Sequence, residues 1–440
     1  MVQPSDTYRF TLVFLAVLGW LGIAAGGWSQ EPGAAGGLVN PVAAAADGEP
    51  AAGAAAPPAA PATEPQQSPP QQSPPVDWLA GTPDFFGDFF RVGSQLAFYV
   101  PSDHPTSGVL DLPLAGGSPR LSVAENNGTL SQDRIYFLYN HFQNALTDNM
   151  GGSLAGCLPQ ALGLDQYTLG FEKSFLDRTW SVELRMPLVG ANDFTATNLA
   201  GSGGVGNLGD NGGVGQVPPN PGAEVAGGNV GNLAVVVKHR IYESDTCAAA
   251  IGLGIDTPTG SDVQGHLFAA DFVVHNQAVC LVPFIGFLKK PGEDFFYQGF
   301  LSVNVPINGN RIEYCDQGNG WATLGTLDES TLLQLDLEAG RWLYRNPAAV
   351  ALTGFATVVE LHYTTSLQNA DHVGGVIPSN GVQWQFGDVA NRADILDLTI
   401  GLHGEFAGHT LCRVGLALPL QTGANRCFDS ELEVQLERQF

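Results

Sequence analysis

The last thirteen residues of the chain read Phe428-Asp-Ser-Glu-Leu-Glu-Val-Gln-Leu-Glu-Arg-Gln-Phe440. One set of alternate positions is mostly apolar and consists of Phe428, Ser430, Leu432, Val434, Leu436, Arg438 and Phe440. The other set, from Asp429 to Gln439, is wholly polar. Because a β-strand places alternate side chains on opposite faces, the stretch predicts a strand with one apolar and one polar face. At helical spacing the two kinds of residue would mix around the cylinder, so a helix fits less well.

Eleven segments upstream repeat this alternation. They are 134–142, 166–175, 180–186, 233–241, 247–255, 278–287, 295–305, 333–338, 355–363, 396–403 and 411–418. Most are near the 9–11 residues that a tilted strand needs to cross a bilayer. With the final stretch, the chain is expected to form about twelve strands.

The connections between these segments alternate in length. Odd-numbered connections are long, such as 189–231 and 366–392, whereas even-numbered ones are short, such as 176–178 and 243–245. Outer-membrane barrels have short periplasmic turns and longer extracellular loops, and this produces such a parity. A soluble β-sandwich mixes its two ends through Greek-key connections and has no reason to follow it. The predicted fold is therefore all-β: an up-and-down antiparallel transmembrane β-barrel over residues 133–440.

Composition argues against several classes of protein. The 440 residues carry a net charge of −25, with 4 Lys and 14 Arg, so nucleic acid is an unfavourable partner. After the first 30 residues, no stretch of roughly 18 apolar residues predicts a transmembrane helix. The strands of a membrane β-barrel do not need such an uninterrupted apolar stretch, because only every second residue faces lipid.

Three segments are expected before the barrel. Residues 1–30 resemble a secretory signal peptide, with Arg9 ahead of an apolar run and small residues after it; an uncleaved anchor is the alternative. Residues 31–75 are rich in Ala, Pro and Gln and predict a disordered linker. Residues 76–132 contain the aromatic stretch Asp84-Phe-Phe-Gly-Asp-Phe-Phe90. This segment is either a plug that docks on the barrel or a lead-in with its own aromatic cluster.

The polar faces of the strands predict the lining of a lumen. The candidate lumen-facing residues are Glu172, Glu183, Arg185, Lys238, Arg240, Asp336, Glu338, Glu360, His362, Asp397, Arg413, Glu431, Glu433 and Glu437. Acids outnumber bases, and rings of acids favour cations, so an open lumen would be weakly cation-selective. The alternative is that these charges pair across the lumen and fill it, because twelve strands lie between a filled and a water-containing barrel.

Other chemistry receives less support from the sequence. Glu360 and His362 could face Asp397 and His403 on the next strand, but no activated Ser or Cys accompanies them, so no enzyme is predicted. The six Cys residues include no C-x-x-C pair, and neither a metal site nor a cofactor is expected. Cys412 and Cys427 flank a turn signal and are a possible disulfide in an oxidising compartment.

Five short blocks of sequence add to the evidence from the strand pattern. They are Leu114–Gly117, Ala124–Asn127, Asp133–Arg134, Tyr139–Asn140 and Phe296–Phe300. Together with the strand pattern, they resemble uncharacterised, signal-bearing, porin-like bacterial outer-membrane β-barrel proteins. The resemblance implies the barrel and its location but no substrate. Phe440 would serve as the terminal assembly signal, although Arg438 stands where such signals usually carry an apolar residue.

The expected function is a porin-like channel for small hydrophilic solutes in the bacterial outer membrane. Its linker would lie in the periplasm, and its partners would be membrane lipid and the barrel-assembly machinery. Two alternatives remain open: a structural or surface-binding barrel without an open pore, and a soluble secreted β-sandwich that binds a ligand.

Overall fold

The computed structural model describes residues 81–87, 94–101, 106–117, 120–149, 160–190, 194–196, 223–227, 230–267, 270–316, 319–406 and 409–440. All of them belong to one unit, Asp77–Phe440. The expected signal peptide and linker lie outside the described residues, as does Cys157.

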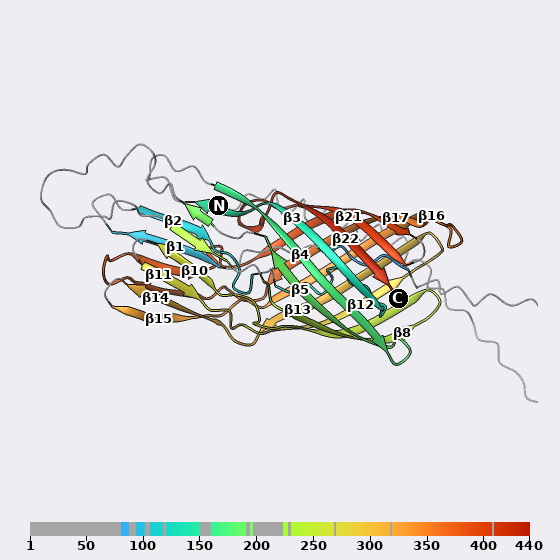
Figure 1. The fold of residues 1–440 in the computed structure, drawn as a ribbon, viewed down its shortest axis with the longest axis horizontal. Helices are drawn as coiled ribbons and strands as arrows, with labels where there is room; N and C mark the ends of the chain where they lie inside the picture. The colour runs from blue at the N-terminus through green and yellow to red at the C-terminus, as the bar shows by residue number, and fades with distance from the viewer. Residues whose placement is uncertain are drawn as a thin grey trace, which may run out of the picture. The chain divides into compact units, whose positions relative to one another are not determined.

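Twelve antiparallel strands form a closed barrel (Figure 1). In chain order they are β3 (Arg134–Asn149), β4 (Gln160–Phe175), β5 (Trp180–Val189), β8 (Ala234–Glu243), β9 (Cys247–Asp256), β12 (Cys280–Lys289), β13 (Phe295–Pro306), β16 (Leu332–Arg345), β17 (Leu352–Ser366), β20 (Asp394–Phe406), β21 (Thr410–Pro419) and β22 (Ser430–Gln439). Each pairs with the next, and β22 pairs with β3 to close the ring. The predicted fold class and strand number are confirmed.

Apolar and polar residues that alternate along each barrel strand also alternate in solvent exposure. In β22, Leu432 and Leu436 are more than 40% exposed, whereas Glu431, Glu433 and Glu437 are at most 5% exposed. The barrel thus presents apolar side chains outward and polar side chains inward, which is the pattern of a barrel in lipid. No helix among the residues described above is long and apolar enough to cross a membrane.

The closing strand is fixed at its end by contacts across the seam. The backbone N–H of Phe440 donates to the carbonyl of Asp133 at 3.1 Å, and its ring stacks on Phe171 with centroids 6.2 Å apart. Arg438 lies on the outer face, where its Nη1 donates to Thr410 Oγ1 at 2.7 Å. A hydroxyl partner near the end of the strand explains how the outward face tolerates this charge.

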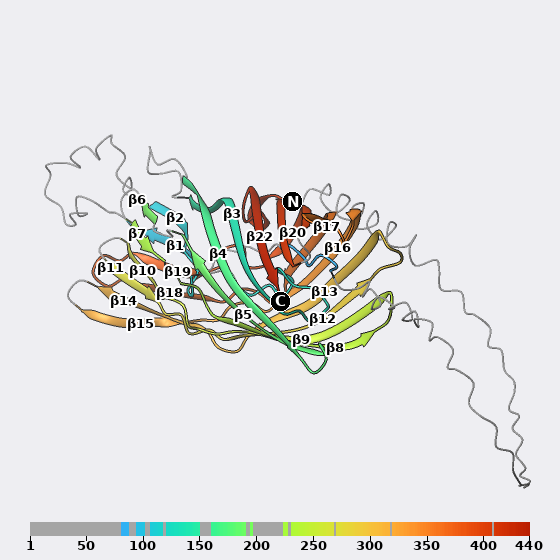
Figure 2. The same ribbon diagram turned by 45° about the vertical axis from the view of Figure 1, so that its right-hand side comes forward.

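The described residues of several long connections form β-strands. Four of them form the hairpins β6 (Phe194–Ala196) with β7 (Ala223–Ala226), β10 (Val263–Leu267) with β11 (Ala270–Val274), β14 (Asn310–Asp316) with β15 (Gly320–Leu327), and β18 (His372–Val376) with β19 (Gln383–Gly387). The first three form a six-stranded sheet. The fourth pairs with β1 (Gln95–Val100), which pairs with β2 (Thr106–Asp111). Figure 2 shows these strands together at one end of the barrel.

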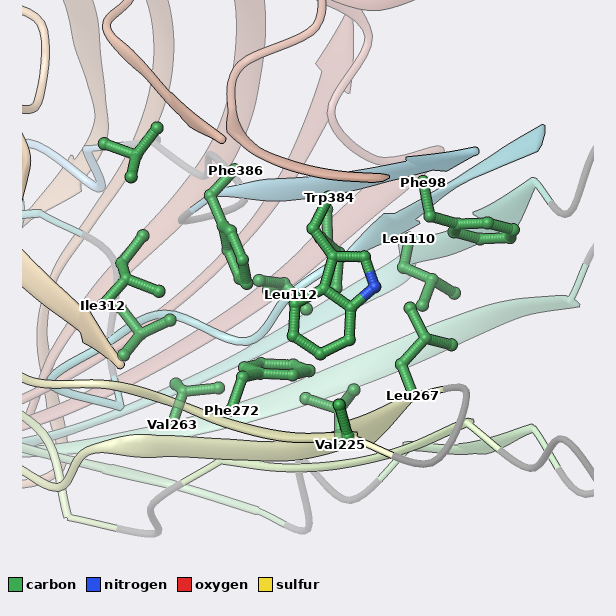
Figure 3. Close-up of a cluster of buried hydrophobic side chains, with 14 of the residues drawn as sticks. Phe98, Leu110, Leu112, Val225, Val263, Leu267, Phe272, Ile312, Trp384 and Phe386 are labelled. Atoms are coloured by element: carbon green, nitrogen blue, oxygen red, sulfur yellow. The ribbon is translucent and has the colours of Figure 1, made fainter. Parts of the chain in front are cut away.

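The two groups of strands enclose an apolar core and form a β-sandwich. Its centre contains Trp384 and Phe386 of β19, which contact Phe272 of β11 edge-to-face at 5.8 and 5.4 Å between ring centroids (Figure 3). Phe98 of β1 and Leu110 of β2 belong to the same cluster. β2 also pairs with the far end of β3, so one sheet of the sandwich continues into the barrel wall.

Candidate functional site: the barrel interior

Two ends of the barrel serve as landmarks. The short-turn end carries the tight connections, such as Leu176–Thr179, and the start of β3. The long-loop end carries the sandwich. Residues 81–87 and 120–132, here called the inner segment, lie on either side of β1 and β2 in the sequence. Their contacts, described next, place them against the inward face of the strands.

All but one of the predicted lumen residues are buried. Those that are at most 5% exposed are Glu172, Glu183, Arg185, Lys238, Asp336, Glu338, Glu360, His362, Asp397, Arg413, Glu431, Glu433 and Glu437. Arg240 is the exception: it is half-buried near the short-turn end and pairs with Glu243 at 2.5 Å. The alternation of the sequence carries no information about what these buried side chains contact.

Arg134, the first residue of β3, is the centre of an ion-pair network. Its guanidinium contacts Asp84 of the inner segment at 2.5 Å and Glu172 and Glu437 at 2.8 Å each. Glu183 lies 3.7 Å away. Arg134 itself is 0% exposed. Because a buried guanidinium needs both counter-charge and hydrogen-bond acceptors, this network joins the two ends of the barrel chain to the inner segment.

The first part of the inner segment is held by its backbone. The N–H groups of Phe86 and Gly87 donate to the two carboxylate oxygens of Glu360, at 2.8 and 3.1 Å. Arg413 donates to the carbonyls of Asp84 and Phe85. Charge-assisted bonds of this kind satisfy backbone groups that are shielded from water. They also hold an irregular segment in one conformation.

Glycines on two strands make room for Phe86. A Cβ on Gly401 of β20 would overlap the Phe86 ring, and one on Gly415 of β21 would lie 2.8 Å from it. Arg413 lies over the same ring, with its Cζ 5.1 Å from the centroid. The aromatic side chain therefore fits a notch that only residues without a Cβ can form. The sequence pattern alone gives no sign of this role for the two glycines.

The second part of the inner segment is held by cations on the barrel wall. Lys238 Nζ donates to Asn127 Oδ1 and to the carbonyls of Gly128 and Leu130, at 2.8–2.9 Å. Arg185 Nη1 donates to the carbonyl of Ser122 at 2.9 Å. A single ammonium can serve three acceptors because it carries three donors.

Apolar contacts complete this packing. Phe85, Leu121 and Val123 of the inner segment form a buried cluster with inward residues of three strands, Ala234, Val236, Val282, Phe284 and Phe300. Phe85 meets Phe300 edge-to-face at 5.5 Å between centroids. These bulky inward residues were missed because the sequence pattern suggested a polar lumen. The signal that could reveal them is an aromatic residue on the polar face opposite a glycine, as in Phe300 opposite Gly286.

The four acid–base residues that the sequence raised as possible neighbours on β17 and β20 do not all lie together. His362 contacts Asp336 through Nδ1 at 2.8 Å and Glu360 through Nε2 at 3.0 Å. Asp397 is the register partner of His362, as expected. His403, however, pairs with Ala356, which lies near the other end of β17. Carboxylates on β16 and β17 therefore hold the buried imidazole of His362 from both of its nitrogens.

The predicted disulfide is wrong. Cys412 and Cys427, both described, are not joined. The register places Cys412 opposite Leu436, near the short-turn end of the barrel. Cys427 instead packs beside Phe428 at the other end of the hairpin. A turn signal between two cysteines does not make them partners when the hairpin register pairs each with a different residue.

Two cavities border the inner segment. One, of about 270 Å³, lies at the short-turn end and is lined by the inner segment together with Arg178, Arg240, His409 and Phe440. The other, of about 40 Å³, is lined by Asn140, Gln166 and Glu431 among others. Within the described ranges, no group of three His, Cys, Asp or Glu side chains could hold a metal ion.

Comparison with known proteins yields structural likeness only. No family model matches the chain, and no curated protein matches it. Similar solved structures include an outer membrane channel from Pseudomonas putida F1, with 11% identity, 73% of this chain and 100% of that chain covered, and a TM-score of 0.38. The toluene transporter TbuX from Ralstonia pickettii shows 11% identity, 74% and 96% coverage, and a TM-score of 0.35.

The NanC porin shows 6% identity, 70% coverage of this chain and 98% of its own, and a TM-score of 0.34. These are porin-like outer-membrane proteins, the kind of protein that the sequence resembles. At such identities the likeness concerns the barrel fold alone.

Proposed function

We propose that the protein is a bacterial outer-membrane β-barrel that is closed by its own inner segment and presents the β-sandwich at the cell surface. The observation that carries this proposal is the occupation of the barrel interior. Carboxylates, guanidiniums and an ammonium on five or more strands are bonded to residues 84–87 and 120–130. Such a barrel acts as an anchor and display platform in its resting state.

The outward face supports a membrane location. Large apolar side chains such as Leu169, Ile251, Ile285, Leu301 and Ile400 are each more than 40% exposed on the barrel strands. An exposed apolar surface of this extent is costly in water and favourable in lipid. Short turns are typical of the periplasmic side of such barrels, which favours a linker in the periplasm and a sandwich outside the cell.

The sandwich supports a display function. Its compact core, with Phe272 and Trp384 both buried, holds the described strands of the long connections together as one packed body. Rigid elements hold a binding surface with little entropic cost.

The proposal is tested by membrane fractionation followed by bilayer conductance. The folded protein is expected in the outer-membrane fraction, with a gel mobility that changes on heating, and with no steady conductance in planar bilayers. A soluble protein of unchanged mobility would contradict the membrane location. Steady conductance of the unaltered, folded protein would contradict closure.

A second candidate function is a channel for small hydrophilic solutes with weak cation preference. The observation that favours it is the acid-rich inner face, where buried strand carboxylates outnumber the buried bases Arg134, Arg185, Lys238 and Arg413. The nine carboxylates are Glu172, Glu183, Asp336, Glu338, Glu360, Asp397, Glu431, Glu433 and Glu437. Passage would require displacement of the inner segment. The double variant Glu360→Gln with Arg413→Met removes charged contacts to Phe86 and Asp84 and is expected to raise the frequency of conducting openings.

The ion selectivity of those openings separates the alternatives. A reversal potential that indicates cation preference would support the channel, and one that indicates anion preference would contradict the argument from the inner-face charges. The variant Arg426→Met, which removes an exposed ion pair to Asp429 at the protein surface, is the matched control and is expected to remain silent.

A further inference from the structure

The base of one long-loop hairpin is closed by a histidine and two acids. Asp262 comes directly before β10 and His275 directly after β11, so both lie where this hairpin leaves the barrel. Glu313 belongs to β14, which pairs with β11 in the six-stranded sheet (Figure 2). Contacts among these three residues therefore join two hairpins that come from different connections of the barrel.

His275 contacts a carboxylate through each of its ring nitrogens. Its Nδ1 lies 3.0 Å from Asp262 Oδ2, and its Nε2 lies 3.0 Å from Glu313 Oε2. An ionised carboxylate only accepts hydrogen bonds, and a neutral imidazole has a single N–H to donate. Both contacts are therefore hydrogen bonds only when the ring is protonated. In the neutral ring, one nitrogen lone pair would face a carboxylate oxygen.

The groups around the ring hold both acids in place. The backbone N–H of Asn276 donates to Asp262 Oδ1 at 2.8 Å, which fixes that carboxylate at the base of the hairpin. The hydrogen bond from His275 and the nearby charge of Arg311 lower the pKa of Glu313. Arg311 Nε lies 3.5 Å from Glu313 Oε1, so this acid is shared between a histidine and an arginine. The charged groups that the structure brings to the His275 ring are thus Asp262 before β10 and Glu313 and Arg311 on β14.

The same junction reaches the barrel wall through Asn276. Its Nδ2 donates to Asn232 Oδ1 at 2.7 Å and to the carbonyl of Gly260 at 3.0 Å. Asn232 lies just before the barrel strand β8. A change at His275 is therefore placed to alter how the hairpin is held both to its neighbour in the sandwich and to the barrel.

We propose that His275 is a pH-sensitive clamp, which holds the β10–β11 hairpin to β14 when its ring is protonated and loosens this junction when the ring is neutral. The folded junction favours the proton, so the stability that the clamp adds is present at low pH. It is lost as the pH rises through the range in which histidine side chains titrate, about pH 6.5 in general. The inference goes beyond the proposed function, because it concerns the long connections and does not depend on whether the barrel is closed.

The test is pulse proteolysis of the full-length protein, folded in detergent, at about pH 5.5 and about pH 8, on either side of histidine titration. The temperature at which the β10–β11 hairpin becomes cleavable is measured by mass spectrometry of the fragments. Each pulse is long enough to digest the heat-denatured protein completely at that pH, so the pH dependence of the protease does not enter. The wild-type hairpin is expected to become cleavable at a temperature a few degrees lower at the higher pH. The heat-dependent gel mobility of the barrel is expected to be the same at both.

Variants assign the pH response to the clamp. His275→Gln removes the titrating ring and is expected to abolish the response. Glu313→Gln offers an amide N–H to the acceptor nitrogen of the neutral ring, so it is expected to raise the cleavage temperature at the higher pH. His266→Gln is the matched control: His266 lies on the same hairpin and contacts Asp271 through Nδ1 at 2.6 Å, a contact that a neutral ring can make. This variant is expected to keep the wild-type response.

Two results would overturn the proposal. One is an equal pH response, or an equal lack of one, in the wild type and His275→Gln. The other is a lower cleavage temperature of Glu313→Gln than of the wild type at the higher pH. That second result is what an ion pair with a purely structural role would give, because such a pair is weakened by loss of the carboxylate at either pH.

Discussion

At the scale of single residues, Arg134 is the side chain whose loss should matter most. It is fully buried among Asp84, Glu172 and Glu437, so its removal leaves several carboxylates without their shared partner. Breaking a buried network in this way costs about 3–5 kcal/mol. The variant Arg134→Met is expected to lose that much in the free energy of unfolding, measured by urea denaturation in detergent. Arg438→Met, which removes one outward hydrogen bond, is the control, and an equal loss in both variants would contradict the argument.

Asp133 is expected to make the stability of the folded protein depend on pH. Burial alone would raise its pKa, but hydrogen bonds from Lys173 Nζ and from the hydroxyl and backbone N–H of Ser174 lower the pKa to about 2. The ordinary value is 3.8, so Asp133 contributes stability that is complete above that pH and is lost as the pH falls through about 2. The folded-band transition temperature of the wild type is expected to exceed that of Asp133→Asn at pH 7. The difference in transition temperature between the two proteins should disappear by about pH 2. A difference that stays constant with pH would contradict the assignment of this stability to the Asp133 carboxylate.

At the residue level, the sequence assigns the acids to one face of each strand but carries no information about their partners. The period of two is a property of the strand itself, so Glu360 and Glu433 could be assigned to a face without knowing the fold. Asp84 and Asn127 belong to an irregular segment with no period, and their contacts depend on where the chain passes through the barrel. The same limit explains why the cavity beside Asn140 was not foreseen.

At the scale of elements, the sandwich should unfold separately from the barrel. Trp384 is 2% exposed in its core, and truncation of a buried Trp costs about 3–5 kcal/mol. Trp384→Ala is expected to expose the long-loop hairpins to limited proteolysis while the heat-dependent gel mobility of the barrel persists. Trp321→Ala is the control, since Trp321 is 55% exposed on β15 and its loss should change little. Loss of the folded gel band in Trp384→Ala would mean that the two parts form one cooperative unit.

The hairpins of the sandwich were not predicted as strands. β10 and β11 have five residues each, and glycine interrupts the pattern in β10, as it does in β18. Such strands gain stability only from pairing with strands contributed by other loops. The barrel strands are ten or more residues long and alternate over most of their length, although register shifts interrupt the pattern in β3, β8, β16 and β17. Their length is why sequence reasoning found all twelve of them and none of the shorter ones.

At the scale of the whole molecule, the order of assembly follows from the position of the inner segment. Closure of β22 on β3 encloses residues that are bonded to most of the wall. During refolding, protection of residues 82–87 and 120–132 from protease is expected to appear before or together with the folded gel mobility. Pulsed proteolysis with mass spectrometry measures both. Closure that precedes this protection would show that the segment can enter a finished barrel.

The pairing of β2 with the far end of β3 has a mechanical consequence. The chain enters the barrel at Gly81, passes to β1 and β2 beyond the long-loop end, and returns along residues 120–132 to Arg134. The sheet formed by β1, β2 and β19 is broader than the single chain that leads to it. This sheet is therefore expected to resist being pulled through the barrel. A force applied to the residues before Gly81 would press the sheet against the long-loop end of the barrel, and the backbone hydrogen bonds that pair β1 with β2 and β19 would bear that force in shear.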